Sequence, residues 1–387
     1  MYAVFLDASK AFDKVEHVKL FSELLNRGIC PVVVRYLFVS YQVSKLAVKW
    51  EESVSSFFPQ GNGVKQGAVL SPILFAIYID PLIKRLRDSR VGCHIGRTAS
   101  NVFGYADDLV LLAPTVTAVN RLLKICEEFS EEFNLTFNPS KSSLLTFHPP
   151  GMKEEYTNIL FLGKPIPTNY TEKHLGHLLS TSRKSVDFCD IIRDVKIKTN
   201  VILKEFSHLN TWSKVKLFNS QCLSLYGCEL WDLSDQNIKK ICCEWRKCSR
   251  QILGISPRTH NFLIPQLMST PDLLSTIYSR ILSFCNRGLS HPSEEIRFLF
   301  ENFVYNPGSS FANNIKTICN KLGVSRNTAF TLKATKVKSM CNKLGINEGA
   351  GNISRSISEL IDIRDGQLHC NLNYYETTEC LTALCTG

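Results

Sequence analysis

Two adjacent carboxylates, Asp107 and Asp108, interrupt the apolar run FGYADDLVLLA at residues 103–113. Ionised side chains rarely lie in apolar surroundings unless something pairs with them. At ~5 Å and an effective dielectric of ~20, two like charges repel each other by roughly 3 kcal/mol. A straight strand would point the two side chains to opposite faces, whereas the tip of a hairpin lets both face one opening. We therefore expect a strand pair with residues 106–108 at its tip and a cationic partner for both acids.

A third acid, Asp7, ends the apolar stretch AVFL, which we expect to be a strand. If this strand lies beside the predicted hairpin, three carboxylates converge. Mg²⁺ prefers oxygen ligands and commonly combines a few carboxylates with water and substrate phosphates. Two such ions ~3.5–4 Å apart can stabilise the attacking and leaving oxygens of phosphoryl transfer. The pattern predicts a site for two Mg²⁺ ions, with Mn²⁺ as the alternative metal.

Hydrophobic periodicity and capping residues predict the main elements around these acids. One helix is expected to begin at Asp13 as its N-cap, and a second at Ser71, with Pro81 ending or kinking it. A third is expected over residues 117–133, and two strand pieces over 135–147. Beyond about residue 185 the pattern is helical. These elements predict a mixed fold, with strands and helices first and helices after.

Composition limits the classes of partner and location. The net charge of +10 favours a polyanionic partner. No stretch resembles a secretory signal, and the longest apolar segment is too short to span a bilayer, so no membrane is expected. The fifteen cysteines are scattered and form no C-x-x-C pair. This pattern favours buried, reduced thiols in an intracellular protein.

Five segments together resemble the palm motifs of reverse transcriptases, in order and spacing. They are FLDASKAFDKV, GNGVKQGAVLSPILFAIYID, FGYADDLVLL, NPSKSSLLTF and KHLGHLL, at residues 5–15, 61–80, 103–112, 138–147 and 173–179. They are most similar to those of LINE-type, non-LTR retrotransposons. The later stretches LSLYGCELWDLS and SRQILGISPRTHNFLIP also look like the region that follows this palm.

The resemblance implies an α+β fold of the right-hand polymerase type, with an antiparallel sheet and packed helices. It implies a palm over residues 1–180, a helical thumb over 185–260 and a helical C-terminal region over 261–387. The implied activity is RNA-directed DNA polymerisation, the addition of dNTPs to a primer 3′-hydroxyl by two-metal phosphoryl transfer. An RNA template, a DNA primer and dNTPs would be its partners, and the nucleus its location.

The resemblance also assigns roles to single residues. Asp7 and Asp107 would bind both metal ions, with Asp108 as the third carboxylate. Ala8 would offer a backbone carbonyl to one ion. Phe12 matches the bulky residue that rejects a ribose 2′-hydroxyl, although by itself the pattern favours a core residue of the following helix.

Further residues match the nucleotide and primer contacts of the family. Gln66 and Gly67 match the segment that contacts the incoming nucleotide, and Lys141 matches a lysine near the leaving pyrophosphate, although a lysine beside a turn is ordinarily a solvated charge. The primer strand would be contacted by Tyr105, Ala106, Leu175 and Gly176. Histidines 174 and 177 lack a third metal ligand and are interpreted as structural.

Basic residues of the predicted thumb form a second candidate surface. Lys239, Arg246 and Arg250 can share one side of a helix and would then grip phosphates without reading sequence. The alternative is a solvated helix face.

The pattern departs from the family upstream of Asp7, where only six residues stand. We expect the fingers and the endonuclease domain to be missing, strand neighbours of the first segment to be lost, and a second chain to supply the fingers. Three alternatives stay open: a maturase of the group II intron type, a non-catalytic nucleic-acid-binding relic or domesticated palm, and an inert fragment.

Overall fold

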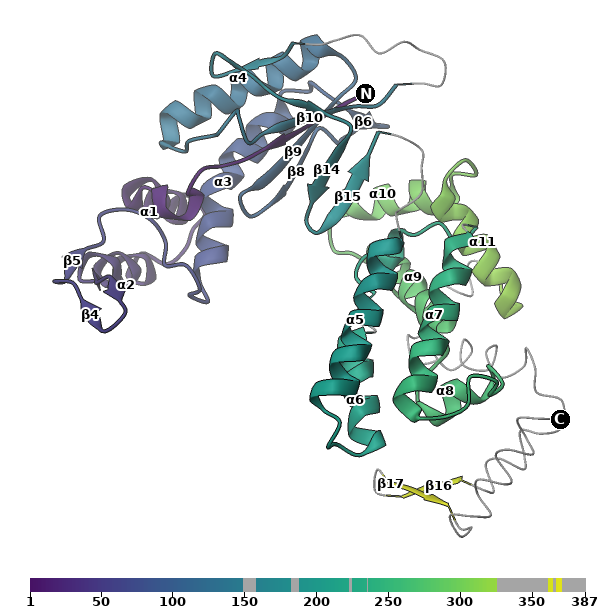
Figure 1. Cartoon of the computed structure of the whole chain (residues 1–387). Helices are drawn as coiled ribbons and strands as arrows, with labels where there is room; N and C mark the ends of the chain where they lie inside the picture. Colours follow the sequence, from purple (N-terminus) through teal and green to yellow (C-terminus); the bar gives the residue numbers. More distant parts are fainter. Residues whose placement is uncertain are drawn as a thin grey trace. The chain divides into compact units, whose positions relative to one another are not determined.

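A computed structural model divides the chain into two compact units, Met1–Lys184 and Ser185–Gly387 (Figure 1). The structure describes residues 1–148, 158–181, 188–222, 225–234, 236–325, 361–364 and 367–370. Each unit contains its own large hydrophobic cluster. The expected α+β class, a sheet with packed helices followed by a helical part, is confirmed.

The first unit is built on one five-stranded sheet. In spatial order its strands are β13 (Thr168–Asn169), β10 (Ser143–Thr146), β1 (Tyr2–Leu6), β9 (Asp108–Ala113) and β8 (Val102–Tyr105). Neighbours are antiparallel except for the parallel pair β10 and β13. Strand β1 lies at the centre, with a neighbour on each edge. The expectation that its neighbours are lost is therefore wrong, because β9 and β10 both come from later in this chain.

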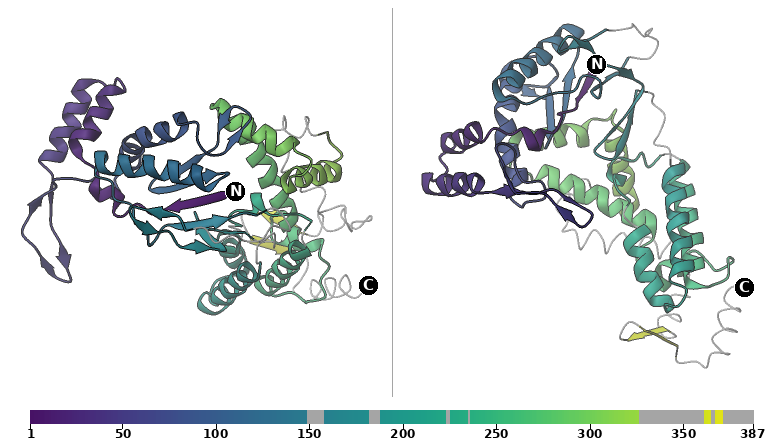
Figure 2. Two further views of the ribbon diagram at one scale, coloured as in Figure 1. Left: turned by 90° about the horizontal axis from the view of Figure 1, so that it is seen from above. Right: turned by 60° about the vertical axis from the view of Figure 1, so that its left-hand side comes forward.

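Helices cover one face of this sheet. The helical elements of the first unit are η1 (Ala11–Lys14), α1 (His17–Asn26), α2 (Pro31–Gln42), α3 (Ser71–Asp88) and α4 (Val116–Phe133). Figure 2 shows α3 and α4 on the same side of the sheet. Alternation along the strands sends Leu6 and Leu109 into the main cluster beneath these helices, and Phe5 and Val110 into a small cluster on the opposite face.

Short hairpins complete the first unit. They pair β2 (Lys45–Leu46) with β5 (Phe58–Pro59), β3 (Lys49–Trp50) with β4 (Ser53–Val54), β6 (His94–Ile95) with β7 (Thr98–Ala99), β11 (Leu160–Phe161) with β12 (Lys164–Pro165), and β14 (Thr171–His174) with β15 (His177–Ser180). The β14–β15 turn has positive φ at both central residues, 47° at Leu175 and 79° at Gly176. Positive φ at both positions is the signature of a type I′ hairpin turn.

Two expected helix boundaries differ in the structure. Helix α1 begins at His17, and Asp13 lies in η1 without capping it. Helix α3 does not end at Pro81, one of the two outcomes expected there, but continues through it to Asp88. Burial explains the continuation, because the fully buried Leu82 and Leu86 pack in the core on the far side of the proline. Their burial offsets the roughly 3 kcal/mol that an internal proline costs.

Before residue 326, the regular elements described in the second unit are all helices. Its helical elements are α5 (Cys189–Glu205), α6 (Thr211–Cys222), η2 (Cys228–Leu230), α7 (Gln236–Leu253), α8 (Leu263–Leu267), α9 (Leu273–Leu289), α10 (Glu294–Tyr305) and α11 (Ser310–Leu322). Strands β16 (Ile361–Arg364) and β17 (Gln367–Cys370) form an antiparallel hairpin, where the sequence predicts helices. One hydrophobic cluster runs through residues 188–319, on both sides of the predicted boundary at 260.

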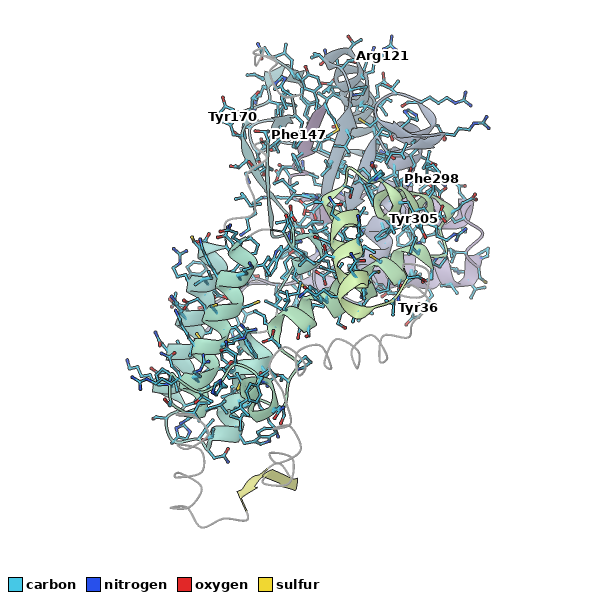
Figure 3. All side chains as sticks on the ribbon, turned by 90° about the vertical axis from the view of Figure 1, so that its right-hand side faces the viewer. Tyr36, Arg121, Phe147, Tyr170, Phe298 and Tyr305 are labelled. Atoms are coloured by element: carbon cyan, nitrogen blue, oxygen red, sulfur yellow. The ribbon has the colours of Figure 1, made fainter. Side chains whose placement is uncertain are left out.

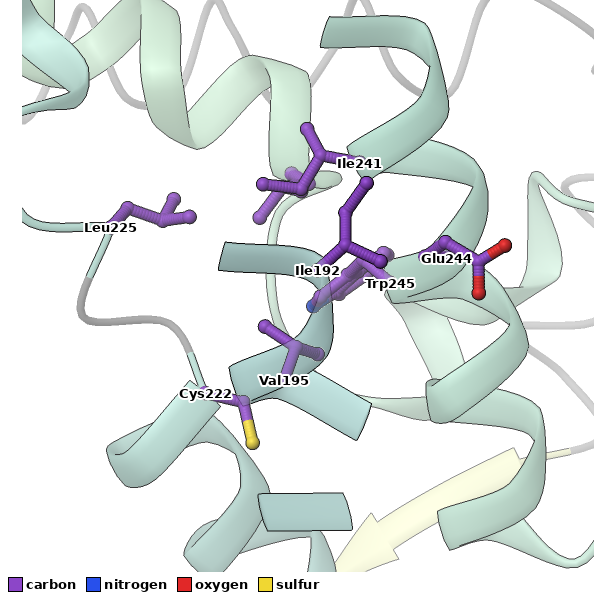
Figure 4. A pocket seen from close by; sticks show the side chains of 8 residues that line it. Ile192, Val195, Cys222, Leu225, Ile241, Glu244 and Trp245 are labelled. Atoms are coloured by element: carbon purple, nitrogen blue, oxygen red, sulfur yellow. The ribbon is translucent and has the colours of Figure 1, made fainter. Parts of the chain in front are cut away.

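Trp245 of α7 is the largest fully buried side chain of the second unit, and it lies where α7 packs against α5 and α6. Figure 4 shows a gap beside it, lined by apolar side chains such as Ile192, Val195 and Ile241. The gap measures about 10 Å³, the lower limit for a single water molecule. It is a packing defect of the core and too small to be a ligand site.

Two general features of the described residues are the state of the cysteine thiols and the apolarity of the helices. Every cysteine with a described side chain carries a free thiol. Burial raises the pKa of Cys228 to about 12, which keeps that thiol protonated. Within the part of the chain that the structure describes, no helix combines the length and apolarity needed to cross a bilayer.

A close backbone contact at Gly63 gives a test of the fold. A Cβ there would lie 2.8 Å from the carbonyl oxygen of Asp13, at φ +87°, whereas at Gly28, with φ +75°, it would meet nothing within 4 Å. Gly63→Ala is expected to lower the free energy of unfolding by about 3 kcal/mol, and Gly28→Ala by about 1 kcal/mol, since only the first adds a clash to the left-handed strain. Urea unfolding followed by circular dichroism measures both. Equal losses would contradict this account.

Candidate active site

The turn between β8 and β9 carries the adjacent acids. Tyr105 and Asp108 are the closing pair of the hairpin, so the tip consists of Ala106 and Asp107. Ala106 has φ 55°, a left-handed conformation that favours glycine at this turn position. The tip is thus one residue shorter than expected, because Asp108 belongs to β9. Tyr105 is 68% exposed, beside the acids.

The register between β1 and β9 brings the third acid to the same place. Leu6 pairs with Leu109 in the antiparallel ladder. One step further along, Asp7 lies opposite Asp108. Alternation puts both residues on the sheet face of Phe5 and away from the helices. The predicted neighbourhood of the two strands is confirmed by this register.

The electrostatics of Asp108 link the three acids. Partial desolvation raises the pKa of Asp108, and the negative charges of Asp107 and Asp7 raise it further, whereas His174 lowers it. The His174 ring lies 5.3 Å from the ring of Phe5. His174 therefore lies close enough to Asp108 to interact with its charge, a proximity that the sequence did not predict. Only its place next to the glycine turn of KHLGHLL signalled this position.

The carboxylates of Asp7, Asp107 and Asp108 are suitable ligands for a hard divalent cation, although they are not grouped around one point in the described structure. Carboxylate oxygens are the ligands that Mg²⁺ prefers, and their mutual repulsion favours a bound cation. Within the described residues, no three His, Cys, Asp or Glu side chains are grouped closely enough to hold one metal ion.

Hydrogen bonds fix the backbone of Asp7 to the loop that carries Lys141. The amide of Asn138 donates to the Asp7 carbonyl at 2.9 Å, and the Asp7 amide donates to Ser142 Oγ at 3.2 Å. Ala8 forms an antiparallel bridge with Phe137. Lys141 is exposed and lies in the same turn, between the two anchoring residues. The turn thus holds the Lys141 backbone beside the strand end that bears Asp7.

The loop with Gln66 and Gly67 is anchored to the segment that follows Asp7. The Val64 amide donates to the Phe12 carbonyl at 2.8 Å, and Gln66 Nε2 donates to Asp13 Oδ1 at 3.1 Å. Gly67 has φ 81° with open space around it. The Phe12 ring stacks on Phe75 at 4.6 Å and is half-buried. Phe12 is thus both a packing residue and partly accessible.

The β14–β15 hairpin presents Leu175 and Gly176 at its turn, directly after His174. Ser143 of β10 donates from its hydroxyl to Glu172 Oε2 at 2.6 Å, which holds the hairpin to the sheet. The predicted primer-contacting turn and the acids therefore lie in one compact unit.

The structure corrects the interpretation of the basic helix α7. Arg246 donates to Asp272 Oδ1 from Nε at 3.2 Å and from Nη2 at 3.0 Å. Arg250 donates to the Thr259 carbonyl and to Asn261 Oδ1. Both arginines hold parts of the second unit together, so the expectation that they grip phosphates is wrong. Lys239 is exposed on the same helix.

Comparison with known proteins locates a family match in the first unit. Residues 1–169 match the family described as reverse transcriptase (RNA-dependent DNA polymerase). The chain is 34% identical over 140 residues to the Pol polyprotein of the type-2 retrotransposable element R2DM of Drosophila melanogaster, covering 36% of this chain and 13% of that protein. It is 28% identical over 275 residues to a probable RNA-directed DNA polymerase of the Drosophila melanogaster transposon X-element, covering 65% of this chain and 28% of that protein.

A third relative and a solved structure complete the comparison. An uncharacterised 149 kDa protein of the Xenopus laevis transposon TX1 is 30% identical, covering 43% of this chain and 14% of that protein. The chain thus spans less than a third of these three relatives. A telomerase from Candida tropicalis with a telomeric RNA fragment aligns over 78% of this chain and 49% of its own, with a TM-score of 0.33 and 12% identity. At that score the likeness does not establish a shared fold.

The raised pKa of Asp108 gives a pH-dependent prediction. Since its native pKa lies above the usual 3.8, ionisation of Asp108 destabilises the native state. This penalty is absent below the unfolded pKa and develops fully as the pH rises through the native pKa. Asp108→Asn is therefore expected to raise the melting temperature at pH 7 in EDTA, with no gain below pH ~3.8. A lower melting temperature for the variant at pH 7 would contradict this.

The Arg246–Asp272 pair gives a second prediction. Asp272 is 8% exposed and also caps α9 by accepting a hydrogen bond from Leu274. Arg246→Met is expected to lower the free energy of unfolding by about 3 kcal/mol, because it leaves a buried carboxylate without its cation. The exposed Lys239→Met serves as the control, with a change within about 0.5 kcal/mol. Chemical unfolding measures the free energy of unfolding of both variants. Equal values would mean that the Arg246–Asp272 pair does not stabilise the fold, and Arg246 would again be a candidate for phosphate binding.

Proposed function

We propose RNA-directed DNA polymerisation as the activity of this chain, a proposal supported by the match of residues 1–169 to the reverse transcriptase family. It would be the polymerase of a non-LTR retrotransposon, acting on an RNA template, a DNA primer and dNTPs. One observation carries the proposal. The β1–β9 register sets Asp7 opposite Asp108, at a hairpin tip that also bears Asp107. Three carboxylates from two distant motifs thus occupy one end of one sheet.

The proposed mechanism assigns these acids to metal binding. Asp7 and Asp107 would hold two Mg²⁺ ions, or Mn²⁺, with Asp108 as a supporting carboxylate and Ala8 as a backbone ligand. When bound, the ions supply positive charge to the attacking and leaving oxygens. The protein contributes position: the hydrogen bonds to Asn138 and Ser142 fix the Asp7 backbone before substrate arrives.

The nucleotide would lie between the Asp7 strand end and the Gln66–Gly67 loop. The Phe12 ring, held by Phe75, would reject a ribose 2′-hydroxyl by overlap, so that the product is DNA. Gln66 and Gly67 would contact the incoming nucleotide, and the open space around Gly67 admits a close approach. Lys141 would donate a proton to the leaving pyrophosphate.

The primer and further partners complete the proposal. Tyr105 and Ala106 would lie under the primer end, and Leu175 and Gly176 would contact its strand. A second chain would be a further partner, and exposed apolar side chains near α2 and the following hairpins support such a contact. Val32, Tyr36 and Trp50 are 75%, 74% and 76% exposed (Figure 3, which labels Tyr36). The nucleus is the proposed location, with residues 185–260 as thumb and 261–387 as C-terminal region.

A second candidate function is binding of nucleic acid without catalysis. It is favoured by the absence, among the described residues, of three acidic or histidine side chains close enough to share a metal ion. All three acids are nevertheless present, and polymerisation therefore remains the first proposal.

The deciding experiment measures dNTP incorporation on a primed RNA template with Mg²⁺. Asp107→Asn is expected to reduce incorporation at least 100-fold, because the variant loses a metal-binding charge. Asp190→Asn, which removes an exposed carboxylate of α5, serves as the matched control and should keep wild-type activity. Equal incorporation by wild type and Asp107→Asn would refute the proposal. A protein that melts cooperatively and binds the primed template without incorporation would support the second candidate.

A further inference from the structure

A polar recess lies at the end of helix α3. It has a volume of about 640 Å³ and is lined by Arg87, Asp88, Arg90, His94, Arg97 and Ala99. The first three belong to the end of α3 and the residues just beyond it, and the others to the β6–β7 hairpin. Two elements that are separate in sequence thus bring three guanidinium groups to one place.

The recess lies at the opposite end of the sheet from the three acids. The Cys93 amide, next to His94, donates to the Leu112 carbonyl at 2.9 Å. Leu112 stands four residues beyond Asp108 in β9, on the order of 14 Å along the strand. Figure 1 likewise shows β6 beside the N-terminal start of β1, whereas Asp7 follows its other end. The recess is therefore a separate site in the same compact unit.

Its charge is unbalanced. Among the described residues, Arg87, Arg90 and Arg97 form no ion pair, whereas Arg85 on the same helix pairs with Glu132 at 2.6 Å. Asp88 is the one carboxylate in the lining. The negative end of the α3 dipole can favour Arg87 and Arg90, but Arg97 stands on a separate hairpin. Three clustered cations with one anion attract a polyanion.

The strained backbone conformation of Arg90 also favours a role for this residue at the recess. Arg90 has φ 53° and directly follows Ser89, the C-cap of α3. Glycine is the usual residue at this position, because a left-handed conformation strains any residue with a Cβ. An arginine at this position destabilises the local backbone, and it places a third guanidinium at the recess.

We propose that this recess binds the phosphodiester backbone of the nucleic acid, at a distance from the polymerisation site. The proposal rests on the proposed function for the identity of the polyanion. Guanidinium forks match phosphate oxygens in bidentate geometry. The lining contains no phenylalanine, tyrosine or tryptophan on which a base could stack, so the contact would be made to the backbone phosphates. A strand following the sheet would span the two sites in about four nucleotides.

The test measures binding alone, in EDTA, so that no polymerisation occurs. A fluorescein-labelled RNA–DNA hybrid is titrated with protein at several KCl concentrations, and anisotropy is recorded. For the triple variant Arg87→Gln, Arg90→Gln, Arg97→Gln we expect at least a 10-fold weaker affinity at ~0.1 M salt. The slope of log affinity against log salt should fall by about 2 to 3, close to one for each lost phosphate contact.

Two further variants guard against misfolding. Arg121→Gln removes an exposed arginine of α4 (Figure 3) and should change affinity less than 2-fold. Arg90→Gly removes one charge and the left-handed strain together, so its melting temperature should rise while its affinity falls. Weaker binding by a more stable protein cannot arise from unfolding.

The outcomes separate this proposal from the proposed function. An unchanged salt slope in the triple variant overturns the recess proposal, even if the wild type incorporates dNTPs. A reduced slope supports it, even if no variant incorporates dNTPs. A polyglutamate peptide that displaces the hybrid from wild type at equal charge concentration would indicate a general acidic partner and overturn the phosphodiester assignment.

Discussion

The antiparallel pairing of β1 with β9 is the constraint on which the first unit depends. This ladder joins the start of the chain to residues a hundred positions later, and it sets Asp7 opposite Asp108. The same alternation that buries Leu6 and Leu109 beneath the helices sends the acids to the other face. A slip of one residue would exchange the two faces, so the hydrophobic core itself enforces the register of the site.

Charge repulsion at this end of the sheet opposes that assembly. The acids raise the pKa of Asp108, and His174 partly compensates. The surrounding structure resists the repulsion through hydrogen bonds: those of the Asp7 backbone to Asn138 and Ser142 on one side, and the Ser143–Glu172 bond that holds the β14–β15 hairpin on another. The site is thus held by its scaffold and destabilised by its own charges, as expected where function needs clustered acids.

Arginines have two distinct fates in this chain. Arg246 donates a hydrogen bond to a carboxylate and Arg250 donates one to a carbonyl, both inside the second unit. Their guanidinium groups are therefore engaged within the fold. Those around the α3 end have no such partners within the described residues, and one of them tolerates a strained backbone. Sequence cannot separate these cases, because no local pattern shows whether an arginine will meet a partner from a distant part of the chain. Only the position of Asp272, 26 residues away from Arg246, decides.

The sequence by itself determined the strand ending at Asp7, the hairpin at Asp107, the helix predicted over residues 117–133 and the match of residues 1–169 to the reverse transcriptase family, since local periodicity and motif order encode these features. Tertiary structure decided the rest. It carried α3 past Pro81, because burial of Leu82 outweighs the lost hydrogen bond. It also brought His174 to the acids and Arg97 to the recess. Such contacts depend on strand order and hairpin placement, which are non-local and leave no pattern in neighbouring residues.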